Sequence, residues 1–256
     1  MILRLFVALF GAMIGSFLNV LIYRLPRGLD FVYTRSSCPH CQKKIPWYLN
    51  IPIVGYLVLQ GRCRDCGEKI SIRYPLVETI LALAALVFMP SFQSSGQVIL
   101  YIYHLALFSA FVVHFFIDLE HHLLLDKINV YLLMLIFPYT VFFYQWKFWF
   151  FGALIGFAGT YLVTWIFYML RGKIGLGGGD IKLFGILGLW LGPLGIVQNI
   201  FLSCFLGSVV GLALLSLKKM SRDNPIPFGP FIMVAASFQL FFPQTFSRFI
   251  GFLGLG

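Results

Sequence analysis

Residues 97–118 read QVILYIYHLALFSAFVVHFFID, an apolar run that ends in a carboxylate. The run from 97 to 117 contains no Asp, Glu, Lys or Arg and is as long as the roughly 20 residues that a helix needs to cross a bilayer. The whole chain is 60% hydrophobic and 11% charged, whereas a soluble domain has about 25% charged residues. Because backbone polar groups in lipid must pair within their own segment, we expect an all-α polytopic membrane protein.

Further apolar stretches predict about eight transmembrane helices, with boundaries uncertain by a few residues. The first is longer than the apolar core of a typical signal peptide and ends at Tyr23-Arg24-Leu25-Pro26 without a small-residue cleavage pattern, so we expect a retained span. Gly192-Pro193-Leu194-Gly195 predicts a tight turn between the sixth and seventh. The expected organisation is a first helix over 1–23, a polar loop over 24–74 and a seven-helix core over 75–256. The predicted spans are 2–23, 75–91, 97–117, 127–145, 149–170, 181–196, 197–217 and 228–252.

Basic residues predict the orientation of these spans. If the 24–74 loop faces the cytoplasm, all of the 19 basic residues except Arg4, Lys147 and Arg248 lie on that side. Lys and Arg collect in cytoplasmic loops, which accounts for the net charge of +10 without a nucleic-acid partner. We therefore expect a multi-pass protein in the lipid bilayer with both termini in the periplasm.

The 24–74 loop contains two C-x2-C pairs, Cys38 with Cys41 and Cys63 with Cys66. This spacing is typical of zinc sites in which two turns each present two sulfurs to one ion. Four thiolates leave no open position on zinc, so the predicted role is structural. A redox dithiol or a pair of disulfides is the alternative, and a cytoplasmic location disfavours stable disulfides. The sequence predicts a small cytoplasmic zinc-binding loop domain.

Two acidic residues stand where predicted spans meet the cytoplasmic surface. Asp118 closes the third span, and Asp180 opens the sixth after the glycine-rich stretch Gly175-Leu176-Gly177-Gly178-Gly179. Ionisable groups at such depths are functional candidates. Two carboxylates at close range can share a proton and so activate water for attack on an amide. The alternative for each residue is a helix cap at the membrane surface.

Other functions remain as alternatives. His121 and His122 with Asp118, Glu120 and Asp126 could suggest a metal centre, but no helical metal-binding motif is present. A transporter would place acids near the middle of the membrane and would show paired repeats, and neither feature is evident. A non-catalytic assembly platform, organised by zinc, is the third possibility.

Six segments, in order, resemble motifs of the type 4 prepilin peptidases, bacterial membrane aspartic proteases with a GxGD signature. A GxGD sequence alone recurs by chance, whereas six motifs in the same order are specific. The one departure is Leu125, which stands where the family usually has proline. The segments are Gly15–Val20 with Tyr23–Pro26, the two cysteine pairs, Ile70–Glu78, Asp118 to Asp126, Gly177–Asp180 and Pro227–Phe231.

The resemblance implies that Asp118 and Asp180 are the catalytic pair of a peptidase. It implies supporting roles for Asp126 and for Gly177, Gly179 and Lys182 in and beside the GxGD stretch. The substrates would be type 4 prepilins and pseudopilins, cut after a basic leader at the cytoplasmic face of the bacterial inner membrane.

Members with a tetracysteine loop usually also N-methylate the new N-terminus of the product with S-adenosylmethionine. The resemblance makes Glu78 and Asn19 candidates for the methyl-donor site through motif membership alone. Asn19 is equally suited to an interhelical hydrogen bond. No glycine-rich nucleotide loop of a soluble methyltransferase is visible in the sequence.

Overall fold

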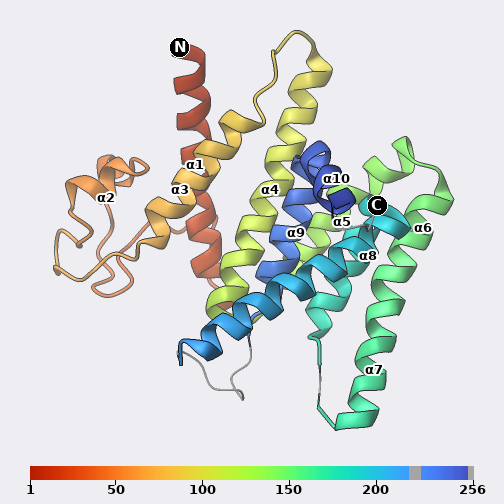
Figure 1. Cartoon of the computed structure of the whole chain (residues 1–256). Helices are drawn as coiled ribbons and strands as arrows, with labels where there is room; N and C mark the ends of the chain where they lie inside the picture. Colours follow the sequence, from red (N-terminus) through yellow and green to blue (C-terminus); the bar gives the residue numbers. More distant parts are fainter. Residues whose placement is uncertain (174, 219–225, 253–256) are drawn as a thin grey trace. The chain divides into compact units, whose positions relative to one another are not determined.

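The computed structural model describes residues 1–173, 175–218 and 226–252 (Figure 1). Lys219 and Arg222, which belong to the predicted cytoplasmic charge excess, lie outside these ranges. The described residues form helices and no β-strand, apart from two isolated bridges in the 24–74 loop. The elements are α1 Ile2–Arg24, η1 Leu25–Arg27, η2 Trp47–Asn50, α2 Val54–Val58, α3 Arg73–Val87, α4 Ser95–His121, α5 Asp126–Phe143, α6 Trp146–Leu154, the π-helical η3 Ile155–Gly159, α7 Thr160–Arg171, α8 Gly178–Ser216, α9 Gly229–Phe241 and α10 Pro243–Phe252.

Within the described residues, five helical segments are long and apolar enough to cross a membrane, which confirms the membrane-protein prediction in its coarse form. They are Ile2–Arg27, Ser95–His121, Asp126–Phe143, Trp146–Arg171 and Gly178–Ser216. The predicted second and eighth spans correspond to shorter helices, α3 with 15 residues and α9 with 13. The number of eight crossings therefore stays a prediction.

The predicted tight turn at Gly192-Pro193 lies inside α8, where two helical halves meet at a kink. Gly192 has φ 68° and ψ −176°, which are not helical angles, and Pro193 follows. Proline removes a helical hydrogen bond, and glycine tolerates the positive φ. A Cβ at Gly192 would also collide with the ring of Phe148. In Figure 1 the second half of α8 turns back from the direction of the first half.

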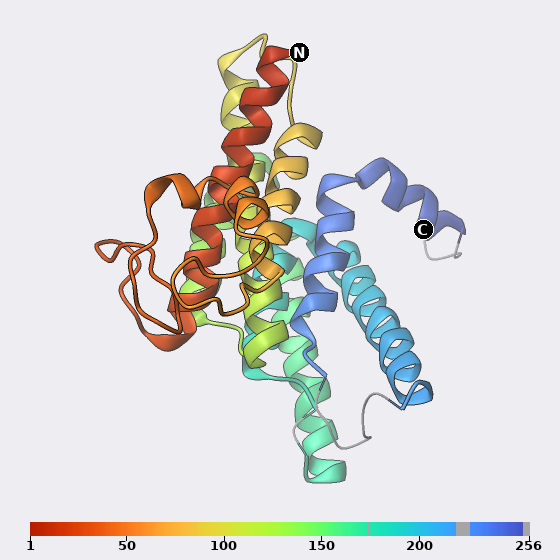
Figure 2. The ribbon, with the colours of Figure 1, turned by 90° about the vertical axis from the view of Figure 1, so that its left-hand side faces the viewer.

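The predicted last span, 228–252, is two helices rather than one. α9 ends at Phe241 and α10 begins at Pro243, with a bend between them that Figure 2 shows clearly. Proline is favoured at the first helical position because its missing N–H is not needed there. Phe246 and Ile250 of α10 pack against Leu202 and Ala235. This apolar contact stabilises the bend.

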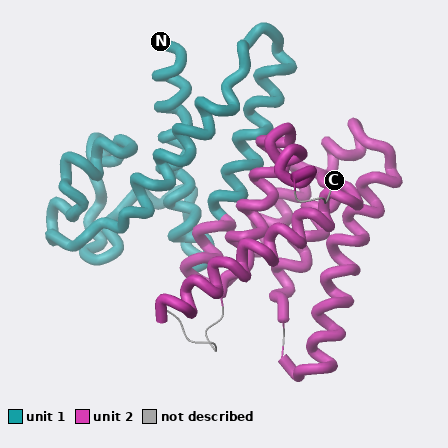
Figure 3. Tube along the Cα trace, viewed as in Figure 1, with its two compact units in different colours: residues 1–113 teal, residues 114–256 magenta. Residues whose placement is uncertain are grey.

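The chain divides into two compact units, 1–113 and 114–256, with the boundary inside α4 (Figure 3). In unit 1, α1 packs closely against α3 through two glycines spaced four residues apart. A Cβ at Gly11 would collide with the Leu81 carbonyl, and one at Gly15 would lie 2.6 Å from Cα of Glu78. Small residues at this spacing let helix backbones approach each other in membranes.

In unit 2, glycines bring α6 and η3 against the first half of α8. A Cβ at Gly152 would collide with the Gly188 carbonyl, and one at Gly156 would collide with the Phe184 carbonyl. Phe184, Leu183 and Leu187 are almost completely buried. This close packing holds the beginning of α8, which carries Asp180, inside unit 2.

Candidate active site

Asp118 lies in the last turn of α4 and is only 5% exposed. Its Oδ2 accepts a hydrogen bond of 2.9 Å from the backbone N–H of Gly229, the first residue of α9. The α4 helix ends three residues later, and His122 follows with φ 53°. The backbone N–H of His122 donates to the Asp118 carbonyl oxygen at 2.8 Å. The main chain at Gly229, which is far from Asp118 in the sequence, thus fixes one oxygen of the Asp118 carboxylate.

Asp180 lies in the first turn of α8 and is anchored in a similar way. Its Oδ2 accepts the backbone N–H of Gly177, the N-cap residue of α8, at 3.2 Å. Its Oδ1 is buried and has no hydrogen-bond partner among the described residues. The two carboxylates interact electrostatically. The Asp118 and Asp180 carboxylates thus lie within electrostatic range of each other, and each is held by one glycine N–H.

Three glycines around the carboxylates lie so close to neighbouring atoms that a side chain would not fit at these positions. A Cβ at Gly177 would lie 2.9 Å from Asp180 Oδ2, and a Cβ at Gly229 would lie 2.8 Å from Asp118 Oδ2. A Cβ at Gly179 would lie 2.7 Å from Cβ of Leu124. Leu124 also approaches Gly229, because a Cβ there would lie 3.0 Å from its Cδ2. Gly178, in contrast, faces open space, since nothing lies within 4 Å of a Cβ built on it.

Asp126 forms an ion pair with Lys182 at the surface of unit 2. The Lys182 ammonium lies 2.8 Å from Oδ1 and 2.9 Å from Oδ2 of Asp126. Both side chains are more than half exposed, and exposed pairs typically contribute about 0–1 kcal/mol. The pair joins the first residue of α5 to the first turn of α8. The structure thus connects two of the predicted supporting residues to each other.

The residue before Asp126 already has the backbone angle that proline would impose. Leu125 is the N-cap of α5 and has φ −75° and ψ 127°, within the range of about −65 ± 15° that a proline ring fixes. Leu125 therefore does not change the direction in which the chain enters α5.

The metal centre considered around His121 and His122 does not assemble. Among the described residues, the only group of three or more His, Cys, Asp and Glu side chains within metal-ligating reach consists of the four cysteines. Glu120 and His122 are exposed. Asp118 is instead held by the Gly229 N–H.

The four sulfurs of the predicted zinc loop gather in unit 1. The ligand atoms of Cys38, Cys41, Cys63 and Cys66 all lie within 4.8 Å of one another, and the Cys38–Cys66 sulfur distance is 3.9 Å. A tetrahedral zinc with Zn–S bonds of about 2.3 Å requires sulfurs about 3.8 Å apart. The donor set and its spacing therefore fit zinc.

The two cysteine turns repeat one backbone pattern. The N–H of Cys38 donates to the Lys43 carbonyl, and that of Gln42 donates to the Cys38 carbonyl. Cys63 pairs with Glu68 and Gly67 in the same way, and Gln42 and Gly67 both have positive φ. Hydrogen bonds from the N–H groups of Cys66 and Asp65 lower the pKa of the Cys63 thiol to about 7. These hydrogen bonds favour the thiolate of Cys63, the form that binds metal.

Asn19 and Glu78 lie in unit 1, at the seam between α1 and α3. The Asn19 amide donates to the carbonyls of Tyr74 at 3.0 Å and Gly15 at 3.3 Å, so it links the two helices. Its Oδ1 is buried without a hydrogen-bond partner in the described ranges. Glu78 is buried, and its Oε2 accepts the backbone N–H of Ile53 at 2.6 Å. Ile53 has φ 63°, an unusual angle for a β-branched residue.

The sequence did not reveal the role of Arg24, whose side chain binds the backbone at the start of the polar loop. The guanidinium of Arg24 is buried and donates to the carbonyls of Asp30, Thr34 and Arg35 at 2.8–3.0 Å. The Asp30 carboxylate accepts the N–H groups of Val32, Tyr33 and Thr34, and the first two of these lower its pKa. The only signal in the sequence was the position of Arg24 in the Tyr23–Pro26 motif.

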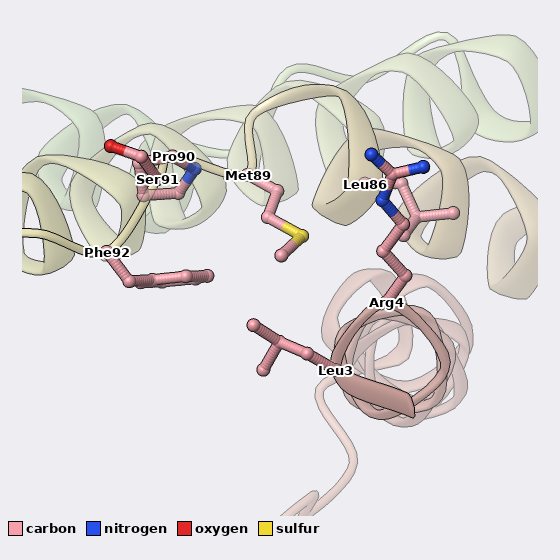
Figure 4. Close-up of a pocket in the computed structure, with 7 residues that line it drawn as sticks. All are labelled: Leu3, Arg4, Leu86, Met89, Pro90, Ser91 and Phe92. Atoms are coloured by element: carbon pink, nitrogen blue, oxygen red, sulfur yellow. The ribbon is translucent and has the colours of Figure 1, made fainter. Parts of the chain in front are cut away.

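A cavity of about 530 Å³ opens in unit 1 beside the start of α1 (Figure 4). Arg4 is its one charged lining residue, and Leu3, Met89 and Phe92 project into the same space in Figure 4. None of the predicted site residues lines it, so the cavity gives no support to a catalytic role. Its lining is Leu3, Arg4, Leu86, Met89, Pro90, Ser91 and Phe92.

Comparison with known proteins shows the family to which the chain belongs. Residues 9–92 match the bacterial peptidase A24 N-terminal domain, and residues 105–212 match the type IV leader peptidase family. Relatives named prepilin leader peptidase/N-methyltransferase include one from Legionella pneumophila, 33% identical over 94% of this chain and 92% of the relative. Those from Aeromonas hydrophila and Pseudomonas aeruginosa are 35% and 34% identical, over 94% and 95% of this chain and 91% and 93% of their own lengths. No solved structure matches the chain significantly. The chain belongs to the type IV leader peptidase family.

Proposed function

We propose that the protein is a membrane aspartic endopeptidase that removes the basic leader of type 4 prepilins and pseudopilins, with Asp118 and Asp180 as its catalytic pair. The observation that supports the proposal is that these two carboxylates lie within electrostatic range of each other, each anchored through one oxygen by a glycine N–H. Family membership supports the same reaction, because the relatives are named for it.

The arrangement suits hydrolysis of an amide. One carboxylate removes a proton from water, and the resulting hydroxide forms a bond to the carbonyl carbon of the scissile peptide. The partner carboxyl, holding a proton, donates a hydrogen bond to the carbonyl oxygen as negative charge develops there. The C–N bond then breaks, and the leaving nitrogen takes up a proton from the pair. The buried Asp180 Oδ1, which has no partner in the described part of the chain, is the atom best suited to bind the water.

The substrate fits the expected topology. A prepilin has a short basic leader before an apolar helix, so the leader would remain in the cytoplasm while the helix lies in the membrane. The basic residues of this chain predict that Asp118 and Asp180 lie at the cytoplasmic surface of the bacterial inner membrane. The scissile bond and the carboxylate pair would then share one depth.

Cleavage of a purified prepilin in detergent, read by mass spectrometry, tests this function. The wild type should release the leader, whereas Asp118→Asn and Asp180→Asn should not. Glu120→Gln is the matched control, because Glu120 lies two residues from Asp118 on the same helix but is exposed. Cleavage by either Asp variant at a rate close to that of the wild type would refute the catalytic pair. Thermal unfolding would verify that each variant is folded.

We further propose that Cys38, Cys41, Cys63 and Cys66 hold a structural zinc ion in a cytoplasmic loop domain. Zinc would cross-link two turns of a loop that has little apolar core of its own. Metal analysis of protein purified without chelator should give one zinc per chain. A preparation that is folded and free of zinc would contradict this assignment.

The family name also supports a methyltransferase activity on the new N-terminus, with Glu78 and Asn19 as candidate donor-site residues. S-adenosylmethionine, when bound, supplies a methyl group on a positively charged sulfur. The buried Glu78 carboxylate and the Asn19 Oδ1, which has no hydrogen-bond partner among the residues described, are acceptor groups that fit a cationic, hydrogen-bonding ligand. Glu78→Gln should lower the affinity for S-adenosylmethionine in calorimetry and abolish methylation while leaving cleavage and zinc content intact. Unchanged binding would exclude Glu78.

A further inference from the structure

The 24–74 loop contains an uncharged segment between its two cysteine pairs. Residues 45–61 read IPWYLNIPIVGYLVLQG and include no Asp, Glu, Lys or Arg. Lys43 and Lys44 precede this segment, and Arg62 and Arg64 follow it. Aromatic and basic residues around an apolar stretch are typical of the membrane–water interface. The apolar part, 51–59, is too short to cross a bilayer, which leaves an interfacial or re-entrant segment.

The segment exposes large apolar side chains. Trp47 is 80% exposed, and Leu57 and Val58 are 65% and 66% exposed. A Cβ at Gly55 of α2 would collide with the Leu49 carbonyl of η2, so the two short helices pack as one piece. Contiguous exposed apolar surface marks an interaction site. The exposed side chains are Trp47, Tyr48, Ile51, Val54, Leu57 and Val58.

Contacts within unit 1 place the segment beside the membrane helices rather than beyond their ends. The Ile53 N–H donates to Oε2 of Glu78 at 2.6 Å, and Glu78 is in the second turn of α3. A Cβ at Gly15 of α1 would lie 2.6 Å from Cα of Glu78. Gly15 precedes Arg24 by nine residues, so this level lies about 14 Å inside the end of α1 at 1.5 Å per residue.

The side chain of Glu78 leans toward the start of α3, so Ile53 lies between this level and the end of α1. Figures 1 and 2 agree, because α2 lies at the height of the middle of α1 in both views. The end of α1 at Arg24 is its predicted cytoplasmic end. The segment therefore lies at the depth of the cytoplasmic leaflet.

The backbone of the segment pairs within the segment, as a lipid environment requires. Pro46 and Pro52 have no N–H group, and the Ile53 N–H is bound by Glu78. A loop in water needs no such pairing, because water can take the place of each partner. Six further N–H groups donate to carbonyls of the segment itself at 2.6–3.1 Å, those of Val54, Gly55, Leu57, Leu59, Gln60 and Gly61.

We propose that residues 45–61 form a membrane anchor that rests in the cytoplasmic leaflet, with Trp47, Leu57 and Val58 among the lipid acyl chains. Interfacial apolar segments enter the boundary between headgroups and acyl chains by about 5–10 Å. The flanking basic residues match the anionic headgroups of that leaflet. Cys41 and Cys63 stand on either side of the segment with their sulfurs within 4.8 Å, so the cysteine cluster closes its base.

Photolabelling from within the lipid tests the anchor. Full-length protein in vesicles of phosphatidylethanolamine and phosphatidylglycerol is irradiated with a phospholipid that carries a diazirine on its acyl chain. Trypsin cuts after Lys44 and Arg62, so the segment is recovered as the single peptide 45–62 for mass spectrometry. It should carry lipid adducts at a yield comparable to that of peptide 148–171, which lies within an apolar membrane span.

Peptide 28–35 is the matched control from the same loop. It exposes Val32 and Tyr33, but the Arg24 guanidinium holds its backbone at the end of α1. It should therefore carry few adducts from a label placed deep in the acyl chain. Equal, low labelling of peptides 28–35 and 45–62 would overturn the anchor, and would leave the apolar segment in water as a surface for a protein partner.

Two double variants test which side chains enter the lipid. Leu57→Asp/Val58→Asp should reduce the adducts on its peptide to the level of peptide 28–35, because charge disfavours insertion. Val32→Asp/Tyr33→Asp adds the same charges to the same loop and should leave peptide 45–62 labelled as in the wild type. Undiminished labelling in the first variant would contradict insertion of Leu57 and Val58. The wild-type labelling decides the anchor even if a variant does not fold, and it does not depend on prepilin cleavage.

Discussion

The backbone N–H of Gly229 donates a hydrogen bond of 2.9 Å to Oδ2 of Asp118, across 111 positions of sequence. Gly229 is the first residue of α9, so the positive end of that helix faces the carboxylate. The contact fixes one oxygen of Asp118 and orients the other. Gly177 does the same for Asp180 at the start of α8.

Gly229→Ala should impair cleavage strongly, because its Cβ would lie 2.8 Å from Asp118 Oδ2 and 3.0 Å from Leu124 Cδ2. Either the carboxylate or the start of α9 must then move. A displacement of this kind can cost about 100-fold in rate. Single-turnover cleavage rates measure the effect. A rate within twofold of the wild type would mean that Asp118 does not depend on this contact.

The two glycines directly before Asp180, Gly178 and Gly179, should respond differently to substitution by alanine. Gly179→Ala places a Cβ 2.7 Å from Cβ of Leu124 and should reduce both the melting temperature and the cleavage rate. Gly178→Ala, with nothing within 4 Å, should have little effect on the rate and should not lower stability, since alanine favours a helix over glycine by about 1 kcal/mol. Equal effects of the two substitutions would disprove the packing explanation.

The Asp126–Lys182 pair should behave as an exposed tether between α5 and α8. Asp126→Lys alone should destabilise the protein by replacing attraction with repulsion, by roughly 1 kcal/mol or less. The charge reversal Asp126→Lys/Lys182→Asp should restore most of the loss. Thermal unfolding at low and high salt measures how much the ion pair contributes to stability, because salt screens the attraction between exposed charges. If the double variant remains as unstable as the single one, the pair has another role.

Substitution of Cys38 by serine should release the metal and destabilise the polar loop. The matched control is Cys204→Ser, because Cys204 is the one cysteine outside the cluster. Zinc content and protease sensitivity of residues 24–74 give the readout. Zinc retained at wild-type stoichiometry in Cys38→Ser would contradict the four-thiolate site.

Leu125→Pro should be tolerated, because Leu125 already has φ −75°. Reduced freedom of the unfolded chain typically raises stability by about 0.4–1 kcal/mol when proline fits the native angle. The melting temperature should stay constant or rise slightly, and cleavage should remain. A lower melting temperature would show that the turn before Asp126 uses the Leu125 N–H or an angle that proline forbids.

Much of this architecture could be predicted because the structure that lipid imposes on a segment depends mainly on the residues of that segment. A run such as 97–117 can only be helical in lipid, and the cysteine spacing predicted a cluster that the sulfurs form. Gly192 and Pro193 predicted a tight turn between two spans, and the structure has a kink at this place within α8. Pro243, in contrast, lies in an apolar stretch where length alone favoured one span, and the break became visible only through the packing of Phe246 and Ile250.

The parts that could not be predicted depend on contacts between distant segments. The sequence indicated Asp118 and Asp180 but not that Gly229 would anchor Asp118, because hydrophobic periodicity does not specify which helix ends meet. The buried Arg24, bonded to three loop carbonyls, resembled one more basic loop residue.

The most direct test of the central claim is a double-mutant comparison of residual cleavage rates under single-turnover conditions. If Asp118 and Asp180 act as one unit, Asp118→Asn, Asp180→Asn and the double variant should show the same residual rate, because removing either member already disables the pair. Residual rates that fall multiplicatively, or substantial cleavage in the double variant, would contradict a carboxylate pair as the catalytic machinery.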